Sequence, residues 1–393
     1  MIAVEEALKI IADQSKNFGT EEVRFNESIG RILSEDIKAD RDFPPFNRAA
    51  MDGITISIDD WKEGMRSFPI SGEQFAGAPI QELKRGTCLE IMTGAVVPSG
   101  ANVVIRYEDT QIENGKATVT IDEVKDGLNI HPQGKDAKAD DLLIPTGKKI
   151  NYGDIGILVT VGKQKVKVKA LPRIAIISTG DELVDVDQTP LPHQIRKSNV
   201  NTLAVLLDQM NIDYEDFHIN DEWEEIQSSL SFVLEKYDVV LMSGGVSMGK
   251  RDFIPDVLEK LHVKKHFHRI AQRPGKPLWF GSNENTTVFG FPGNPVSTLV
   301  CFTVYFKHWL DTSVGNQGTE EYATLSSDVR FEKELTYFVS VAVSNQKGVQ
   351  SANPSTGHGS GDMVNMSLTN AYLALPSDKK EFKEGEVYPL YRI

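Results

Sequence analysis

Two turns rich in glycine and proline carry residue types that bind oxyanions. The first, SGGVSMG, begins at Ser243, and the second, PGNPVS, ends at Ser297. Glycines let backbone amides approach a ligand closely, and the N-terminus of a helix favours an anion. We therefore expect an oxyanion beside Gly244 and Gly245 and beside the free amides of Val296 and Ser297. An ordinary strand-to-helix turn would explain the first motif if it stood alone.

The PGNPVS turn is the more specific of the two. Pro292 and Pro295 stiffen it, and Gly293 is expected to supply a conformation that other residues avoid. Pro295 suits the first position of a helix, where its missing N–H costs nothing. A capped helix start is the alternative, but two prolines at a predicted site favour a binding function.

A basic turn, RPGKP, precedes this motif and carries Arg273 and Lys276. Two cations on a rigid turn suit a doubly charged tetrahedral oxyanion. They could also be ordinary surface cations. The chain has 42 Lys plus Arg against 56 Asp plus Glu, a formal charge of −14, so two cations beside an amide-lined turn are more informative than usual.

Carboxylates fall on the same set of loops. Asp181 and Glu182 lie in STGDEL, Asp221 follows the next predicted strand, and Asp252 follows SGGVSMG. Carboxylates beside a phosphate-like ligand indicate a hard cation, most simply Mg²⁺. The alternatives are that Asp221 caps a helix and that Asp252 is a first-turn acid favoured by the helix dipole. The eight histidines show no metal-ligand spacing, so we do not expect zinc.

The elements that must position these loops alternate in type from residue 172 onward. A buried-strand run at 173–179 and further strand segments at 214–219, 237–242 and 287–291 alternate with amphipathic helices, including one over 254–261 and a long one from Val296. Such alternation predicts a parallel α/β sheet with ligands at the carboxyl ends of its strands. Residues 41–131 and the region after 311 read as β-rich. We expect residues 140–162 to pair with the N-terminus, which makes the first β-rich part an insertion.

Composition limits the remaining possibilities. An acidic chain argues against non-specific binding to nucleic acids or anionic membranes. The two cysteines cannot form a disulfide framework, which indicates a reducing compartment. The start of the chain is no signal peptide, and no apolar run is long enough to span a bilayer. These features predict a cytoplasmic protein without a membrane anchor.

Eight motifs in sequence order resemble the molybdopterin molybdenumtransferases, the bacterial molybdenum-insertion proteins related to the E domain of gephyrin. They are PPFNRAAMDG, IMTGAVVPSGANVVIRYED, GKD, STGDEL, SGGVSMG, RPGKP, PGNPVS and GSGDMVNMSLTNAYLALP. The resemblance implies a split linker domain (1–40 and 137–168), an inserted β domain (41–136), an α/β molybdopterin-binding domain (169–313) and a C-terminal β-barrel (314–393). It also implies a homodimer whose active site is shared between subunits.

The reaction implied by the resemblance inserts molybdate into adenylylated molybdopterin and releases AMP, with Mg²⁺. The family also suggests contacts with the upstream adenylyltransferase and with apo-molybdoenzymes. By matching motif positions, the catalytic positions are Asp52, Thr93, Asp136, Glu182, Asp221 and Asp252, of which Glu182, Asp221 and Asp252 hold the metal. The positions that bind pterin or molybdate are Ser243, Gly244, Gly245, Ser247, Arg273, Lys276, Pro277, Pro292, Pro295, Ser297 and Ser360.

The chain departs from the family pattern at several positions. Arg273 stands where lysine is common, and Lys250 stands where an acid is common. An arginine expected to reach molybdate is missing around residues 338–340. Two other interpretations stay open, a molybdopterin adenylyltransferase-like activity and a non-catalytic pterin scaffold. The β-rich segments on either side of the α/β part argue against the first.

Overall fold

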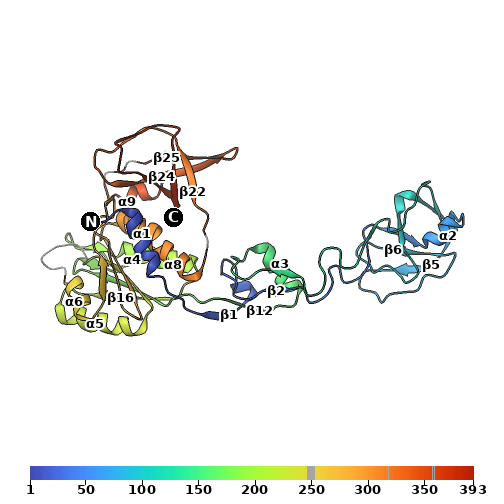
Figure 1. Ribbon diagram of the computed structural model, residues 1–393, viewed down its shortest axis with the longest axis horizontal. Coiled ribbons are helices and arrows are strands. Elements are labelled where there is room, and N and C mark those ends of the chain that lie inside the picture. The colour runs from blue at the N-terminus through green and yellow to red at the C-terminus, as the bar shows by residue number, and fades with distance from the viewer. Residues whose placement is uncertain (246–252, 317, 356, 358) are drawn as a thin grey trace. The chain divides into compact units, whose positions relative to one another are not determined.

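The computed structural model describes residues 1–393 except 246–252, 317, 356 and 358 (Figure 1). The chain divides into two compact units. The first contains Met1–Glu21, Gly30–Ile32 and Val168–Ile393, and the second contains Glu22–Ile29 and Leu33–Lys167. Within the described residues no helix is both long and apolar enough to cross a membrane.

A six-stranded sheet forms the centre of the first unit. Four neighbouring strands are parallel, as the sequence predicts: β16 (Tyr214–Ile219), β13 (Ile174–Thr179), β17 (Val239–Ser243) and β21 (Thr287–Phe291). The prediction of a purely parallel sheet is wrong at one edge, where β20 (Trp279–Ser282) and β18 (Lys264–Phe267) are antiparallel. These two strands are short, and the polar KKHF of β18 lacks the apolar run by which the other strands are recognised.

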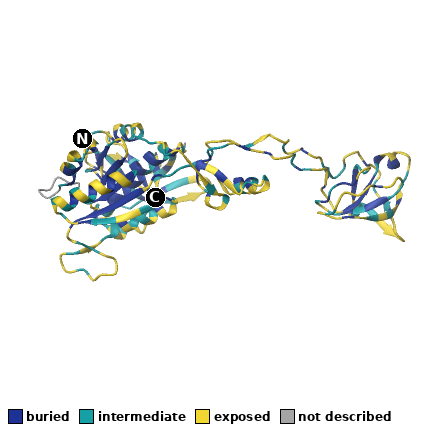
Figure 2. Ribbon diagram, turned by 90° about the horizontal axis from the view of Figure 1, so that it is seen from below, coloured by how far each residue is buried: buried dark blue, intermediate teal, exposed yellow. Residues whose placement is uncertain are grey.

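Helices cover both faces of this sheet because successive strand residues point to opposite sides. Ile174 and Ile176 belong to one buried cluster, whereas Ala175 and Ile177 belong to another. The second cluster contains buried residues of α5 (Trp223–Lys236) and α6 (Ile254–Lys260). The four inner strands β13, β17, β21 and β20 are buried along their whole length, and Figure 2 shows the middle of this sheet in dark blue.

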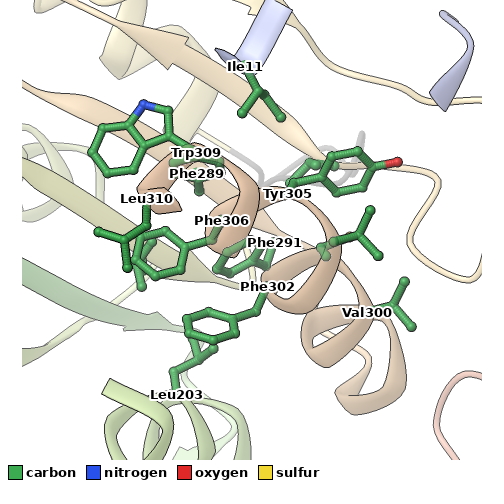
Figure 3. Close-up of a cluster of buried hydrophobic side chains, with 14 of the residues drawn as sticks. Ile11, Leu203, Phe289, Phe291, Val300, Phe302, Tyr305, Phe306, Trp309 and Leu310 are labelled. Carbon is green, nitrogen blue, oxygen red and sulfur yellow. The ribbon is translucent and has the colours of Figure 1, made fainter. Parts of the chain in front are cut away.

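The first cluster contains residues of α1 (Val4–Asp13), α4 (Ser198–Gln209) and one long continuous helix. That helix is α7 (Pro295–Cys301), a π-helical turn η3 (Phe302–Phe306) and α8 (Lys307–Val314). Figure 3 shows Ile11 and Leu203 around the aromatic residues of this helix. The expected pairing of residues 140–162 with the N-terminal part of the chain is confirmed for residues 37–38, which pair with residues 142–144. The helix α1 takes no part in it, because its buried face packs on the α/β core.

A closed β-barrel follows the α/β part within the same unit. Its strands pair in the closed order β24, β25, β22, β28, β26 and back to β24. Their bounds are Glu321–Leu325 for β22, Thr336–Gln346 for β24, Val349–Pro354 for β25, Ala371–Leu375 for β26 and Val387–Arg392 for β28. The two-residue strand β19 (Gln272–Arg273) joins β24 in parallel, so the basic turn is hydrogen-bonded to the barrel.

The second unit contains a β-rich part and a small part with one longer helix. The β-rich part has the strand order β7, β4, β6, β5, β9, β8. Their bounds are Gly53–Ile56 for β4, Ser67–Gln74 for β5, Cys88–Ile91 for β6, Val103–Arg106 for β7, Thr110–Glu113 for β8 and Lys116–Val119 for β9. The smaller part pairs β2 (Ile37–Lys38) with β11 (Leu142–Ile144) and carries α3 (Tyr152–Thr160).

Both cysteines are buried free thiols, as expected for a chain without a disulfide framework. Burial raises the pKa of Cys88 to about 12, with a smaller contribution from the nearby Glu90 carboxylate. Burial also raises the pKa of Cys301, and only a hydrogen bond from Gln272 opposes that shift. Neither thiol is therefore a ready nucleophile at neutral pH.

Candidate active site

The loops singled out in the sequence meet at one edge of the α/β sheet. Ser178 of β13 lies in register with Ser243 of β17, and Ser243 lies in register with Phe291 of β21. On the other side of β13, Thr179 lies opposite Ile219 of β16. Because these strands are parallel neighbours, the segments that follow them emerge side by side.

The glycine pair after β17 is packed where no side chain would fit. Gly244 and Gly245 have φ values of 97° and 64°, which L side chains rarely adopt. A Cβ on Gly245 would lie 2.4 Å from the Cδ1 of Ile254 and 2.8 Å from the Oγ1 of Thr179. The predicted backbone conformations of the two glycines are confirmed, whereas their close approach to a ligand stays a prediction. Ser247, Lys250 and Asp252 lie outside the described residues.

Thr179 was not identified from the sequence. Its side chain is buried, and within the described part of the chain its hydroxyl has no hydrogen-bond partner. A buried hydroxyl normally finds a partner, so an orphaned one beside the Gly244–Gly245 turn suits a ligand that supplies an acceptor or donor there. Thr179 belongs to the STGDEL motif, but the motif does not indicate that its side chain is buried. That burial depends on the packing of two loops that are distant in sequence.

Asn199 joins the two predicted anion turns. Its Nδ2 donates to the Oγ of Ser243 at 2.8 Å and to the carbonyl of Gly293 at 2.7 Å. The expectation for Gly293 is wrong, because its φ lies outside the left-handed region and a Cβ would meet, among the described residues, only Gly244, at 3.9 Å. The shape of the turn therefore comes from Asn199 and from Thr298, whose hydroxyl donates to the Pro292 carbonyl at 2.6 Å.

The expected free amides near Pro295 are wrong in part. The amide of Val296 donates to the Ser360 carbonyl at 3.2 Å, and the Asn294 Nδ2 donates to the Ser360 Oγ at 2.9 Å. A loop of the barrel thus covers the start of α7. Ser297 is only 3% exposed, so its side chain is buried.

A small pocket lies where the barrel meets the basic turn. Its volume is about 80 Å³, room for two or three waters at about 30 Å³ each or for one small tetrahedral ion. Arg273 lines it, together with Ser340, Ser355, Ser360, Asp362 and Asn365 among others. Lys276 and Pro277 are not among its lining residues. One cation and several hydroxyls can hold an oxyanion, while the Asp362 carboxyl would oppose one.

Carboxylates gather at the ends of β13 and β16. The Asp221 amide donates to the Oδ1 of Asp181 at 3.3 Å. A Cβ on Gly180 would lie 2.5 Å from a carboxylate oxygen of Glu182, so that carboxylate folds back over Gly180. The N-cap of α5 is Glu222, so the alternative of Asp221 as the capping residue is wrong.

No group of three or more His, Cys, Asp or Glu side chains is placed to hold a metal among the described residues. Mg²⁺ usually binds one or two carboxylates together with waters and substrate phosphates. The Asp181–Asp221 pair fits that mode by the chemistry of its oxygens. The motif match favours Glu182 as the partner of Asp221, whereas the hydrogen bond joins Asp221 to Asp181.

A separate set of candidates lies in the second unit. The Oδ1 of Asp52 accepts hydrogen bonds from the Thr93 amide at 2.6 Å and from the Thr93 Oγ1 at 2.8 Å. These bonds lower the pKa of Asp52, the backbone bond more than the hydroxyl bond. The Oδ1 of Asp136 lies 3.0 Å from the Nε2 of His131.

Backbone pairing brings the three turns of this set around one short strand. The strand β3 (Arg48–Ala49) pairs with β10 (Ile130–His131), and the Gly94 amide donates to the Ala49 carbonyl. A Cβ on Gly53 would lie 1.9 Å from the carbonyl oxygen of Ile105, so the MDG motif needs glycine for the close pairing of β4 with β7.

Three consecutive parts of the chain match known protein families. Residues 2–162 match the MoeA N-terminal region (domain I and II), residues 175–312 a probable molybdopterin binding domain, and residues 322–392 the MoeA C-terminal region (domain IV). The structure is similar to that of the molybdopterin biosynthesis MoeA protein of Pyrococcus horikoshii OT3. That similarity has a TM-score of 0.83 at 28% identity and covers 100% of both chains.

Two sequence relatives match over nearly the full length of both proteins, and a third is longer than this chain. The chain is 38% identical over 397 residues to a molybdopterin molybdenumtransferase of Synechocystis sp., covering 100% of both proteins. It is 31% identical to that of Bacillus subtilis, covering 98% of this chain and 92% of the relative. It is also 34% identical to gephyrin of Dictyostelium discoideum, covering 78% of this chain and 48% of gephyrin. The chain therefore belongs to the molybdopterin molybdenumtransferase family.

Proposed function

We propose that this protein inserts molybdate into adenylylated molybdopterin and releases AMP, the last step of molybdenum cofactor biosynthesis. The observation that carries the proposal is the placement of two different anion-binding features in one unit. The Gly244–Gly245 turn suits a phosphate group, and the Arg273 pocket suits a small oxyanion. The proposed reaction has two anionic substrates, because adenylylated molybdopterin contains a phosphoanhydride and molybdate is a separate dianion. It therefore needs both the turn and the pocket.

In this proposal the protein acts by positioning and by charge. The backbone around Ser243 and Gly244 holds the phosphate of the pterin, and the Thr179 hydroxyl gains a partner when that ligand binds. Arg273, Lys276 and the Ser360 hydroxyl hold molybdate. The dithiolene sulfurs of the pterin form two bonds to molybdenum and displace two oxygens of molybdate, which leave as water after protonation. A further water cleaves the phosphoanhydride, so that AMP leaves and the pterin keeps its own phosphate. Neither step forms a bond to a side chain of the protein.

Asp181 and Asp221 would hold Mg²⁺, together with Glu182 and Asp252 as the sequence predicts. When bound, Mg²⁺ would neutralise the phosphoanhydride and stabilise the charge on the departing AMP. The Asp221 amide donates to the Asp181 carboxylate, which holds that carboxylate at the start of the Asp221 loop.

The second unit contributes Asp52, Thr93 and Asp136 to catalysis in this proposal. We expect the protein to be a cytoplasmic homodimer in which each active site takes residues from both subunits, with the four domain boundaries stated above. The proposal is supported by polar turns in both units of the chain. Hydrogen bonds fix the Asp52–Thr93 turn in the second unit, and close packing fixes the Gly244–Gly245 turn in the first. The upstream adenylyltransferase and apo-molybdoenzymes are the expected partners for delivery of substrate and product.

The test is AMP release from adenylylated molybdopterin in the presence of Mg²⁺, with and without molybdate. The proposal expects release that depends on molybdate. Lys276→Ala should raise the half-saturating molybdate concentration by about tenfold, the usual scale for a lost hydrogen bond to a charged group. AMP that forms from ATP alone would favour an adenylyltransferase. Pterin binding with no molybdate-dependent AMP would favour a scaffold, and either result would sink the proposal.

A further inference from the structure

The basic turn, residues 273–277, exposes its cationic side chains to solvent and directs backbone carbonyls toward the protein core. Both cationic side chains are exposed. Three successive carbonyls accept hydrogen bonds from the body of the unit. Pro274 accepts from the Gln272 Nε2 at 2.9 Å, Gly275 from the Cys301 Sγ at 3.6 Å, and Lys276 from the Ile270 amide at 3.0 Å.

Of these donors, Gln272 is the unusual one. Its side chain is 0% exposed and lies against a large apolar cluster. A buried amide is costly unless it is hydrogen-bonded. Its Nε2 reaches Pro274, and its Oε1 accepts a hydrogen bond from the Tyr305 hydroxyl. The two ends of one amide thus connect the core to the basic turn.

Tyr305 reaches Gln272 from the π-helical turn η3. It is fully buried, and Figure 3 shows its hydroxyl directed away from Phe302 and Phe306. Burial also raises the pKa of Tyr305, so the hydroxyl stays protonated and remains a donor. A π-helical turn costs regular helix hydrogen bonds, and such turns are frequent at functional sites.

Gly275 lets the backbone of the turn pack directly against Gln272 and Cys301. Its φ is 85°, and a Cβ would lie 2.6 Å from the Cys301 Sγ and 2.7 Å from the Gln272 Nε2. The turn is therefore seated directly on the two side chains that bind its carbonyls. A shift of the turn would break both contacts together.

We propose that Gln272 and Tyr305 are positioning residues that fix the basic turn, and with it Arg273 and Lys276, for binding of the oxyanion. The inference rests on the proposed function and adds residues that touch no substrate. A purely structural role would not need this chemistry, since two apolar side chains of similar volume fill a core as well as a polar pair does. What only the polar pair provides is a directed bond to the Pro274 carbonyl.

The chain offers a matched control for the Tyr305 hydroxyl. Tyr372 is also fully buried in the same cluster, and within the described residues its hydroxyl has no hydrogen-bond partner. Tyr305→Phe and Tyr372→Phe therefore remove the same atom from the same core. Only the first removes a link to the turn. Gln272→Met, which keeps the volume and loses both bonds, tests the link from its other end.

The experiment measures AMP release against molybdate concentration, and amide hydrogen exchange of peptides covering residues 270–278. We expect Tyr305→Phe and Gln272→Met to raise the half-saturating molybdate concentration by about 3- to 10-fold, the scale of one lost hydrogen bond. Turnover at saturating molybdate should change less than twofold, roughly within the spread of such measurements. Exchange at 270–278 should become faster in both variants, while Tyr372→Phe should match the wild type in each measurement.

The outcomes separate this inference from the proposed function. If the wild type releases AMP with molybdate and both variants keep its molybdate dependence, the positioning role is overturned. If the wild type releases no AMP, the proposed function fails, and unchanged exchange at 270–278 would then also refute the anchoring. If Tyr305→Phe does not fold, Gln272→Met alone decides the question by the same two measurements.

Discussion

The basic turn of the first unit and the Asp52–Thr93 turn of the second unit present charge in opposite ways. In the basic turn the charged atoms of Arg273 and Lys276 are exposed, while different atoms, the backbone carbonyls, are held from beneath. In the second unit the charged carboxylate of Asp52 is itself the acceptor that joins the two turns.

This difference separates the effects of substitutions. Charge can be removed from the basic turn without loosening it, because none of its anchoring bonds uses a charged atom. At Asp52 the charge and the link between turns reside in the same oxygen, so most substitutions remove both. The comparison can therefore be tested by variants that remove the charge and keep the hydrogen bonds, or remove the hydrogen bonds and keep the charge.

The largest expected effect is at Asp52. Asp52→Ala removes charge and acceptor, and Asp52→Asn keeps an acceptor oxygen for Thr93 while removing the charge. If the charge acts in catalysis, both should lower molybdate-dependent AMP release by roughly 100-fold, the scale of a lost electrostatic contribution to a transition state. Activity retained by Asp52→Asn alone would mean that the attachment is what matters. Binding of the pterin substrate serves as the control for folding.

One glycine in each turn allows the packing of the two turns to be compared. Gly275 and Gly94 have φ values of 85° and 83°. A Cβ added at Gly275 would have neighbouring atoms within 4 Å, whereas a Cβ added at Gly94 would meet none among the described residues. Alanine at either site costs about 1–2 kcal/mol in the left-handed region. Gly275→Ala adds overpacking of about 1–3 kcal/mol against Cys301 and Gln272.

The expected loss of stability is therefore about 2 kcal/mol greater for Gly275→Ala than for Gly94→Ala, the middle of the overpacking range. Urea-dependent hydrogen exchange measures it, because peptides from each unit report that unit's own unfolding. Equal losses at the two sites would contradict the view that the basic turn is seated on its anchors.

The smallest expected effect concerns the pKa of Asp52. Thr93→Val removes the hydroxyl bond but keeps the stronger backbone bond, so the lowered pKa should rise part of the way toward its usual value. A lowered pKa stabilises the folded state above the unfolded pKa, and that contribution is lost as pH falls through the folded pKa. In the variant this loss should be complete at a higher pH. Carboxyl ¹³C NMR measures the shift, and Thr93→Ser, which keeps the hydroxyl, should show none.

The sequence predicts the parts of the fold that depend on local patterns. Apolar runs identified β13, β17 and β21, the alternation of strands with helices indicated β16, and the rule for parallel sheets placed their loops at one edge. The strand β18 was missed because it is a short edge strand with the polar sequence KKHF, and β20 was missed because its buried WFGS run is only four residues long. The glycine pair at 244–245 was recognised because its conformational need is local.

The contacts that complete the site could not be read from the sequence, since they join distant segments. Asn199 reaches Ser243 across 44 positions, and Tyr305 reaches Gln272 across 33. The amide of Val296 looked free because the barrel loop that covers it lies 64 residues further on, at Ser360. Local motifs identify which residues could bind, whereas tertiary contacts decide which backbone groups remain available.

The pairing of β19 with the barrel strand β24 means that the barrel and the α/β part are not independent modules. Gln272 and Arg273 lie in register with Thr336 and Tyr337, so two residues of the α/β part complete a sheet that belongs to the next part of the chain. A fragment that ended before residue 321 would leave this edge without its partner, and an exposed strand edge invites pairing with other chains. Exchange of the barrel between relatives should therefore succeed only if the recipient segment around 271–273 is exchanged with it.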